Sequence, residues 1–93
     1  MQPVRVRGFE SRQILGIPDT SDVLVIVEYE NFRGTWPNLF RVSSNGEERW
    51  ASAPGGADAY THIDLRGDRV VGTTHYGRTR QIDLASGAIV ASE

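Results

Sequence analysis

The sequence predicts an all-β protein, built as an antiparallel meander of about eight strands. Short runs rich in Val, Ile, Thr and Tyr recur along the chain, and stretches of Gly, Asn, Asp and Ser separate them. Asn45-Gly46 lies between two such runs and is a strong hairpin signal, because both residues tolerate a positive φ. Clear helical periodicity is hard to find anywhere in the sequence. Strands joined by tight turns are therefore expected along the whole chain.

The first half is expected to form four strands after a short edge strand. Residues 23–29 are the clearest strand, since their first five residues are apolar and indicate a strand covered on both faces. Pro18 opens a turn-forming stretch before this strand, and Gly34 and Pro37 mark residues 30–38 as a loop after it. The edge strand is 4–6, and the others are 12–17, 23–29, 39–42 and 47–53.

The second half is expected to form four further strands. A flexible stretch at 54–58 precedes them, because it contains a Pro and two Gly residues. Gly67, Gly77 and Gly87 each mark a turn between successive β-rich runs. The expected strands are 59–65, 69–76, 79–84 and 88–92.

The two halves share one plan. When Gly46 is placed on Gly87, residues 39–52 match residues 80–93 without a gap, at a period of about 41 residues. A four-stranded unit of this length is typical of propeller blades. The chain is therefore interpreted as one domain, 1–93, with a first repeat unit at about 10–52 and a second at about 57–93.

The repeated segments resemble a known family. The segment "DLASGAIVAS" resembles the Asp-x-x-(Ser/Thr)-Gly-x-x-x-Trp segment of quinoprotein-like (PQQ-type) β-propeller repeats, and "NGEERW" is similar to the part that ends in Trp, here Trp50. The second unit has Ala91 at the Trp position, and the first unit has Val42 at the position of the leading Asp. The resemblance covers roughly residues 23–93 and implies four-stranded, blade-like units. The second half is also similar to short uncharacterised bacterial proteins with an Asp-x-Tyr-Thr segment, and that similarity implies no function.

Two blade-like units cannot close a propeller ring, which typically takes about four to eight blades. The family's cofactor sits at the axis of a complete ring, so no cofactor is expected here. The two sheets must cover their apolar faces in another way. They either pack on each other as a small sandwich or flattened barrel, or pair with a second copy of the chain as a homodimer.

Composition excludes several chemistries. The chain has neither Cys nor Lys, so it lacks disulfides, a thiolate nucleophile and a Schiff-base lysine. A formal net charge of -2, with charges scattered along the chain, argues against a nucleic-acid-binding surface. The chain has no apolar run of membrane-spanning length, and its first residues lack the apolar core of a signal peptide. A cytoplasmic protein without nucleic-acid or membrane partners is expected.

The two histidines suggest a metal site on the predicted hairpin that joins 59–65 to 69–76. Counting outward from the turn places His62 opposite Thr73 and His75 opposite Tyr60, so the imidazoles are diagonal neighbours. With an Asp they would supply three metal ligands for a small metal-dependent hydrolase. Two solvent-facing histidines explain the pattern more simply, and we favour that interpretation. The candidate ligands are His62, His75, Asp58 and Asp64.

Exposed aromatic and Arg residues suggest a binding surface. Loops on a rigid sheet often carry function, and Trp and Arg are enriched at binding hot spots. The loop at 30–38 therefore either binds a partner or folds Trp36 back over the core. Side chains alternate between the two faces of the strand 59–65. Thr61, Ile63 and Leu65 are expected on the face toward the core, and Tyr60 and His62 on the outward face. The candidate partner-binding residues are Phe32, Arg33, Trp36, Tyr60, His62, His75 and Tyr76.

The sequence thus favours a non-enzymatic, protein-binding or scaffold module, and a bacterial accessory or toxin-neutralising role would suit it. The first alternative is the metal-dependent hydrolase that uses His62 and His75. The second is a self-assembling pair of blades whose partner is another copy of the chain. Convergence of the imidazoles in one cleft would favour the enzyme, and an exposed apolar patch would favour binding.

Overall fold

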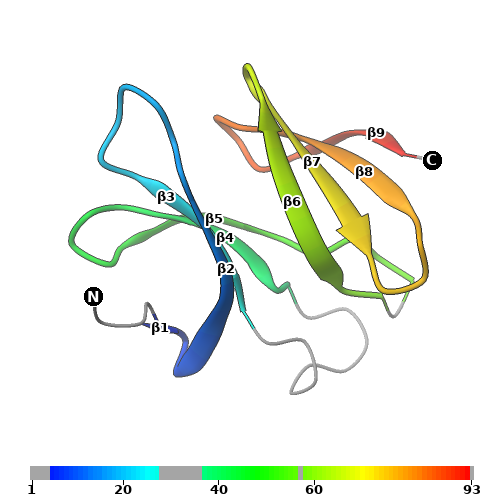
Figure 1. The fold of residues 1–93 in the computed structure, drawn as a ribbon, viewed down its shortest axis with the longest axis horizontal. Coiled ribbons are helices and arrows are strands. Elements are labelled where there is room, and N and C mark those ends of the chain that lie inside the picture. Colours follow the sequence, from blue (N-terminus) through cyan, green and yellow to red (C-terminus); the bar gives the residue numbers. More distant parts are fainter. Residues whose placement is uncertain (1–4, 28–36, 57, 93) are drawn as a thin grey trace.

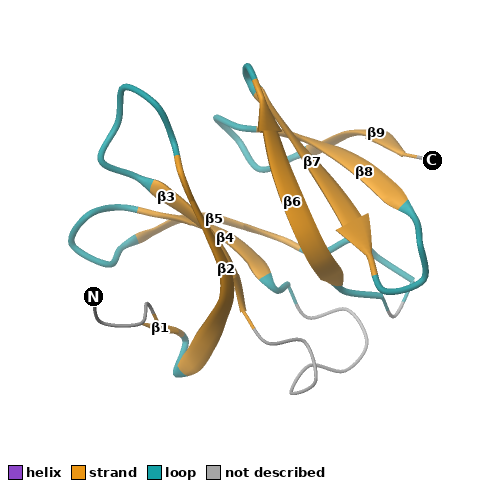
Figure 2. Cartoon of the chain, viewed as in Figure 1, coloured by secondary structure: helices purple, strands orange, loops and turns teal. Residues whose placement is uncertain are grey.

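The computed structural model describes residues 5–27, 37–56 and 58–92, which form two antiparallel sheets without a helix (Figures 1 and 2). Sheet 1 has the order β1-β2-β3-β4-β5, and sheet 2 has the order β6-β7-β8-β9. The predicted all-β meander is confirmed. In the described residues the strands are β1 (Arg5–Val6), β2 (Phe9–Gly16), β3 (Val23–Val27), β4 (Leu39–Val42), β5 (Glu48–Ser52), β6 (Tyr60–Arg66), β7 (Arg69–Thr74), β8 (Thr79–Asp83) and β9 (Ile89–Ser92).

The β1–β2 hairpin was only partly predicted from the sequence. Val6 pairs with Phe9, and the two residues between them, Arg7 and Gly8, have φ values of 54° and 83°. A two-residue turn with two positive φ values matches the twist of the strands that it joins. The sequence pattern predicts the second strand only from residue 12, whereas β2 begins at Phe9, because nothing in the pattern signals a positive φ at Arg7.

The N-terminal hairpin covers the outer face of sheet 1. Val6 packs there in a cluster with Val25, Phe40 and other apolar side chains. The Arg7 guanidinium donates two hydrogen bonds of 3.0 Å to the Glu48 carboxylate and lies 5.0 Å from the centroid of the Phe40 ring. Since the other face of β3 packs against sheet 2, both faces of this strand are buried, as its uninterrupted apolar run predicted.

Trp50 on β5 joins the two sheets. Its indole Nε1 donates a hydrogen bond of 2.8 Å to the carbonyl oxygen of Leu84, which also accepts one of 3.0 Å from Arg41. The indole ring lies directly against Gly87, where a Cβ atom would come within 2.5 Å of the ring. A side chain at position 87 is therefore excluded by the docked indole ring.

Two side-chain amides of sheet 1 bind the backbone of β6. Gln13 accepts a hydrogen bond from the backbone N–H of Ile63 and donates one to its carbonyl, both at 3.0 Å. Asn38 forms the same pair of bonds with Tyr60, at 3.0 and 2.8 Å. An amide can replace the backbone of a missing strand, because it offers one donor and one acceptor. The backbone N–H and C=O groups of Tyr60 and Ile63 on the free edge of β6 are thus hydrogen-bonded to these two amides.

The β4–β5 and β8–β9 hairpins pair in the same way, except that the turn between β8 and β9 has one residue more than the turn between β4 and β5. Val42 pairs with Glu48, and Ile82 pairs with Ile89 in the same way. The turns that follow are closed by bonds from Ser43 N to Glu47 O and from Asp83 N to Ala88 O. Val42 therefore corresponds to Ile82, and the gapless sequence match, which placed it on Asp83, is wrong by one residue.

This equivalence defines how the sheets stack. Val42 faces the outer cluster of sheet 1, whereas its counterpart Ile82 faces the interface between the sheets. Corresponding faces of the two sheets therefore point in the same direction. The remaining face of sheet 2 carries mostly polar and small side chains, namely His62, Asp64, Val71, Thr73, Thr79, Gln81 and Ala91.

Asp22 is linked to the Trp50 contact through Arg41. Its carboxylate lies 2.9 Å from Arg41 Nε and 3.4 Å from Arg49 Nε. The hydrogen bond from Arg41 lowers the pKa of Asp22 below its ordinary value of 3.8. Partial burial acts to raise the pKa, and the charge of Arg49 acts to lower it further. Arg41 thus links the carboxylate in sheet 1 to the Leu84 carbonyl in sheet 2.

Gly87→Ala tests the docking of Trp50, with Gly46→Ala as its matched control. Both glycines have positive φ, so each variant carries backbone strain of about 1–2 kcal/mol. Only Gly87→Ala must also displace the indole, since no atom lies within 4 Å of a Cβ at Gly46. We expect urea unfolding to show an extra loss of about 1–3 kcal/mol for Gly87→Ala. In a Trp50→Ala background the two glycine variants should lose equal stability; an equal loss with Trp50 present would contradict the docking.

Asp22→Asn tests the link through Arg41. Because the pKa of Asp22 is lowered on folding, its carboxylate stabilises the fold above the ordinary value of 3.8, and this stabilisation is lost as the pH falls through the folded value. We expect the variant to be less stable at pH 7 and its free energy of unfolding to depend less on pH in the acid range. Urea unfolding across that range measures this, and an unchanged pH dependence would contradict it.

Candidate functional site

The β6–β7 hairpin contains a bulge that changes the predicted register. His62 pairs with Thr73, as predicted. The register then shifts between Tyr60 and His62, so that Tyr60 pairs with Thr74. His75 lies beyond the end of β7, where its N–H donates to the Ala59 carbonyl at 2.9 Å. The predicted opposition of His75 and Tyr60 is therefore wrong by one residue.

The bulge also turns Tyr60 into the core. Tyr60 was expected to face outward, but its side chain is fully buried in the interface between the sheets. Its hydroxyl lies 3.2 Å from the Ser52 hydroxyl, and burial raises its pKa above 10.0. Thr61, expected to face inward, is the half-exposed residue at the bulge, whereas Ile63 faces the core as predicted. Tyr60 is thus unavailable to a partner.

The turn between β7 and β8 is held by a dense set of hydrogen bonds. Thr74 N donates to Arg78 O at 2.9 Å, Gly77 N donates to Thr74 O at 3.0 Å, and Arg78 N donates to the Thr74 hydroxyl at 3.0 Å. Gly77 has a φ of 78°, which a residue with a side chain rarely adopts. This turn therefore has one well-defined backbone conformation.

Asp58 binds the backbone of this turn through a side-chain hydrogen bond. The residue is buried, and its Oδ1 accepts hydrogen bonds from Ala59 N at 2.9 Å and from Tyr76 N at 3.3 Å. Burial works to raise the pKa of Asp58. The Thr74 hydroxyl, the two backbone N–H groups and the Arg78 guanidinium together outweigh burial and lower the pKa below 3.8. Asp58 is therefore an ionised clamp between the start of β6 and the turn.

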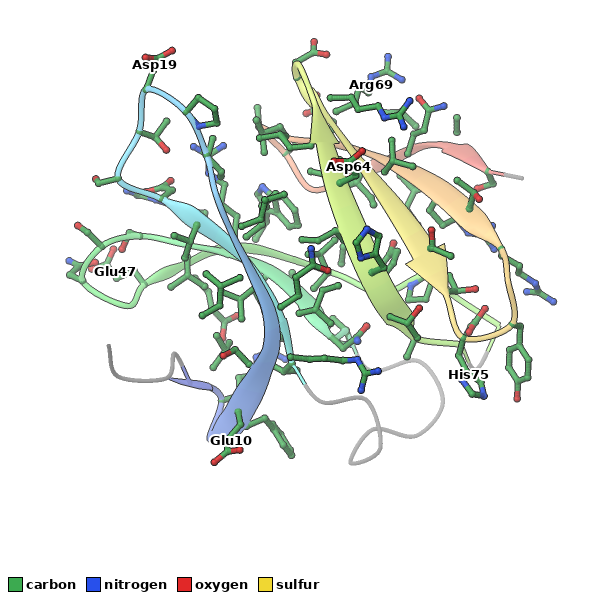
Figure 3. The ribbon with its side chains drawn as sticks, in the orientation of Figure 1. Glu10, Asp19, Glu47, Asp64, Arg69 and His75 are labelled. Carbon is green, nitrogen blue, oxygen red and sulfur yellow. The ribbon has the colours of Figure 1, made fainter. Side chains whose placement is uncertain are left out.

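The clamped turn presents two aromatic rings to solvent. The His75 and Tyr76 rings meet edge to face, with their centroids 5.2 Å apart and their planes at 69°. Tyr76 is 67% exposed, and His75 is exposed beside it at the end of sheet 2 (Figure 3). His62 is exposed as predicted, on the outer face of β6. We define His75 and Tyr76 as the aromatic turn.

The metal site considered as an alternative finds no support in the part of the chain that the structure describes. Within residues 5–27, 37–56 and 58–92, no three His, Asp or Glu side chains are grouped so that they could hold a metal ion. Asp58, considered a possible ligand, instead binds backbone N–H groups.

Most of the predicted binding loop at 30–38 falls outside the described residues, including Phe32, Arg33 and Trp36. Its described neighbours lie near the aromatic turn. Asn38 Nδ2 contacts the carbonyls of Val27 and Tyr60, and Ala59, next to Tyr60, accepts the hydrogen bond from His75. Both flanks of the segment 28–36 are therefore at the end of the molecule where the turn lies.

The role of Asp58 was missed at the sequence level. Asp is favoured in turns because its carboxylate binds nearby backbone N–H groups, and the bond to Ala59 follows that rule. The bond to Tyr76 joins two segments that only the folded hairpin brings together, and no local pattern in the sequence signals it.

Comparison of the chain with protein-family models, with curated proteins and with solved structures finds no match. None of the described elements is a helix that could cross a membrane.

Asp58→Ala tests the clamp. Removal of the acceptor should raise the hydrogen-exchange rate of the Tyr76 amide by about tenfold or more, since a hydrogen bond to a charged group contributes about 1.5–3 kcal/mol. Asp58→Asn keeps an oxygen at Oδ1 and serves as the control, with a smaller increase. Exchange measured by NMR checks this, and equal exchange in the wild type and Asp58→Ala would contradict the clamp.

Proposed function

We propose that the chain is a non-enzymatic, protein-binding module that engages its partner through the aromatic turn. The proposal rests on the exposure of Tyr76. This aromatic side chain is 67% exposed, and Asp58 holds the backbone of its turn through the Tyr76 N–H. A soluble surface gains little from exposing a large ring, and Tyr is among the residues enriched at binding hot spots. The proposal assigns Tyr76 the role of anchor.

The rigidity of the turn supports this role. Binding loses free energy when a loop must be ordered, so a turn already held by hydrogen bonds binds with a smaller entropic loss. Asp58 and Thr74 hold the backbone on both sides of the two rings. The His75 ring contacts the Tyr76 ring in an edge-to-face arrangement, which favours one orientation of the phenol. A protein partner with an apolar pocket and a hydrogen-bond acceptor for the phenol fits this surface.

Other candidate residues belong to the same proposal. Phe32, Arg33 and Trp36 lie outside the described residues and remain candidate partner-binding residues from the sequence alone. His62 would contribute from the exposed face of β6. A bacterial accessory or toxin-neutralising role in the cytoplasm, and the resemblance to PQQ-type repeats, are further parts of the proposal that rest on the sequence.

Tyr76→Ser tests the proposal. A photo-crosslinking residue at position 75, next to an intact Tyr76, identifies the bound protein in cells of the source organism. The purified partner is then titrated by calorimetry against the wild type and variants. We expect Tyr76→Ser to weaken binding at least about tenfold, as loss of a hot spot does.

Ile14→Ser is the matched control, because Ile14 is also an exposed apolar side chain but lies on β2, away from the turn. It should leave the affinity within about twofold of the wild type. Thermal unfolding verifies that both variants are folded. Equal binding by Tyr76→Ser and wild type, or the absence of any cross-linked protein, would overturn the proposal.

A further inference from the structure

The strands β5 and β9 occupy the same place in their sheets. Each is the last strand of its sheet, each pairs with its neighbour on one side only, and each carries a register shift at the same point. Arg41 pairs with Trp50 just as Gln81 pairs with Ala91. The molecule thus contains two versions of one edge strand, and their sequences can be compared position by position.

The comparison shows that one edge is charged and the other is apolar. The pairings place Ile89 at the position of Glu48, and Val90 at the position of Arg49. Glu48 is bound by Arg7, and Arg49 lies near Asp22. Ile89 and Val90, by contrast, are 40% and 47% exposed. Charged residues on an edge strand prevent pairing with other chains, and β9 lacks this protection.

The other edges in the described residues are protected. β6 has part of its free backbone bound by the Gln13 and Asn38 amides, and it also carries Asp64 and Arg66. β1 is two residues long and pairs only with Phe9 and Glu10, and the remaining edge of β2 carries Arg12 and the Gln13 amide that binds β6. β9 is four residues long, contains no charged residue and lies at the outer limit of sheet 2 (Figure 1). The shared register shift does not explain the difference, because β5 has it too.

We propose that β9 pairs antiparallel with β9 of a second copy of the chain. A two-fold axis across β9 would set the Ile89–Val90 half of one strand against the Ala91–Ser92 half of its partner. Because Ile89–Ser92 contains no charge, two copies meet without burying an ionised group or placing like charges opposite each other. The pairing joins two four-stranded sheets into one continuous sheet and removes the apolar edge of both.

The dimer should be weak and reversible. A strand of four residues buries much less than the roughly 800 Å² per partner of a standard stable interface. Association is therefore expected at high protein concentration, in a fast equilibrium with monomer. The aromatic turn lies at the β7–β8 connection and not on β9, so this inference stands apart from the proposed function.

Val90→Lys tests the pairing, with Ile14→Lys as its control. Ile14 is 39% exposed, so the two substitutions remove similar apolar exposure and add the same charge, but Ile14 lies on β2 in the other sheet, away from β9. Sedimentation equilibrium is measured on the full chain from about 10 μM to about 1 mM, a range that covers weak association. We expect the wild type and Ile14→Lys to dimerise with the same dissociation constant, and Val90→Lys to weaken the dimer at least about tenfold.

NMR spectra over the same concentrations give a second readout that does not depend on a variant. Amide shifts of Ile89–Ser92 should move with concentration, and those of β2 should not. A wild type that is monomeric at about 1 mM would overturn the proposal and leave the edge for an extended segment of another protein. A dimer unaffected by Val90→Lys, or concentration-dependent shifts away from β9, would overturn it as well.

Discussion

The contact between Trp50 and the turn after β8 is the constraint on which the rest of the structure depends. Each sheet has an apolar face that must be buried against another element, so each sheet needs the other. The indole fills the space above Gly87 and donates to Leu84, and Arg41 donates to the same carbonyl. The amides of Gln13 and Asn38 then fix β6 against sheet 1. Apolar burial draws the sheets together, and these polar contacts select one relative position.

The stack of sheets ends on both sides within this one chain. On the outer face of sheet 1, the β1–β2 hairpin covers the apolar cluster, and Arg7 holds that hairpin through Glu48 and Phe40. On the outer face of sheet 2, the positions that correspond to Leu24 and Trp50 are Val71 and Ala91, and polar side chains surround them. In the described residues, the outer face of sheet 1 is therefore covered, and that of sheet 2 is mostly polar.

This frame determines which parts of the surface are free for other roles. The backbone of the aromatic turn is fixed by Asp58, which itself is held at the start of β6 by the packing of Tyr60 between the sheets. The edge strand β9 lies across sheet 2 from β6, and its pairing with β8 leaves its outer side open in the described part of the chain. The two surfaces rest on different residues, so either proposal can fail without the other.

The sequence by itself determined the class of fold and the positions of most turns and strands. Alternation and Gly-containing turns are local properties, and they correctly located the hairpins at Asn45-Gly46 and at Gly67. The inward face of Tyr60 and the extra residue in the second turn were decided by the tertiary structure. A bulge reverses the alternation that a sequence pattern assumes, and it forms only when two strands pair.

The clamp from Asp58 to Tyr76 and the contact of Trp50 with Gly87 also depended on tertiary structure. Each joins segments that are distant in the chain, and no local preference of Asp, Trp or Gly specifies the partner. The sequence contained the residues needed for both contacts. Strand pairing within sheet 2 brought Asp58 and Tyr76 within hydrogen-bonding distance, and the packing of one sheet on the other brought Trp50 against Gly87.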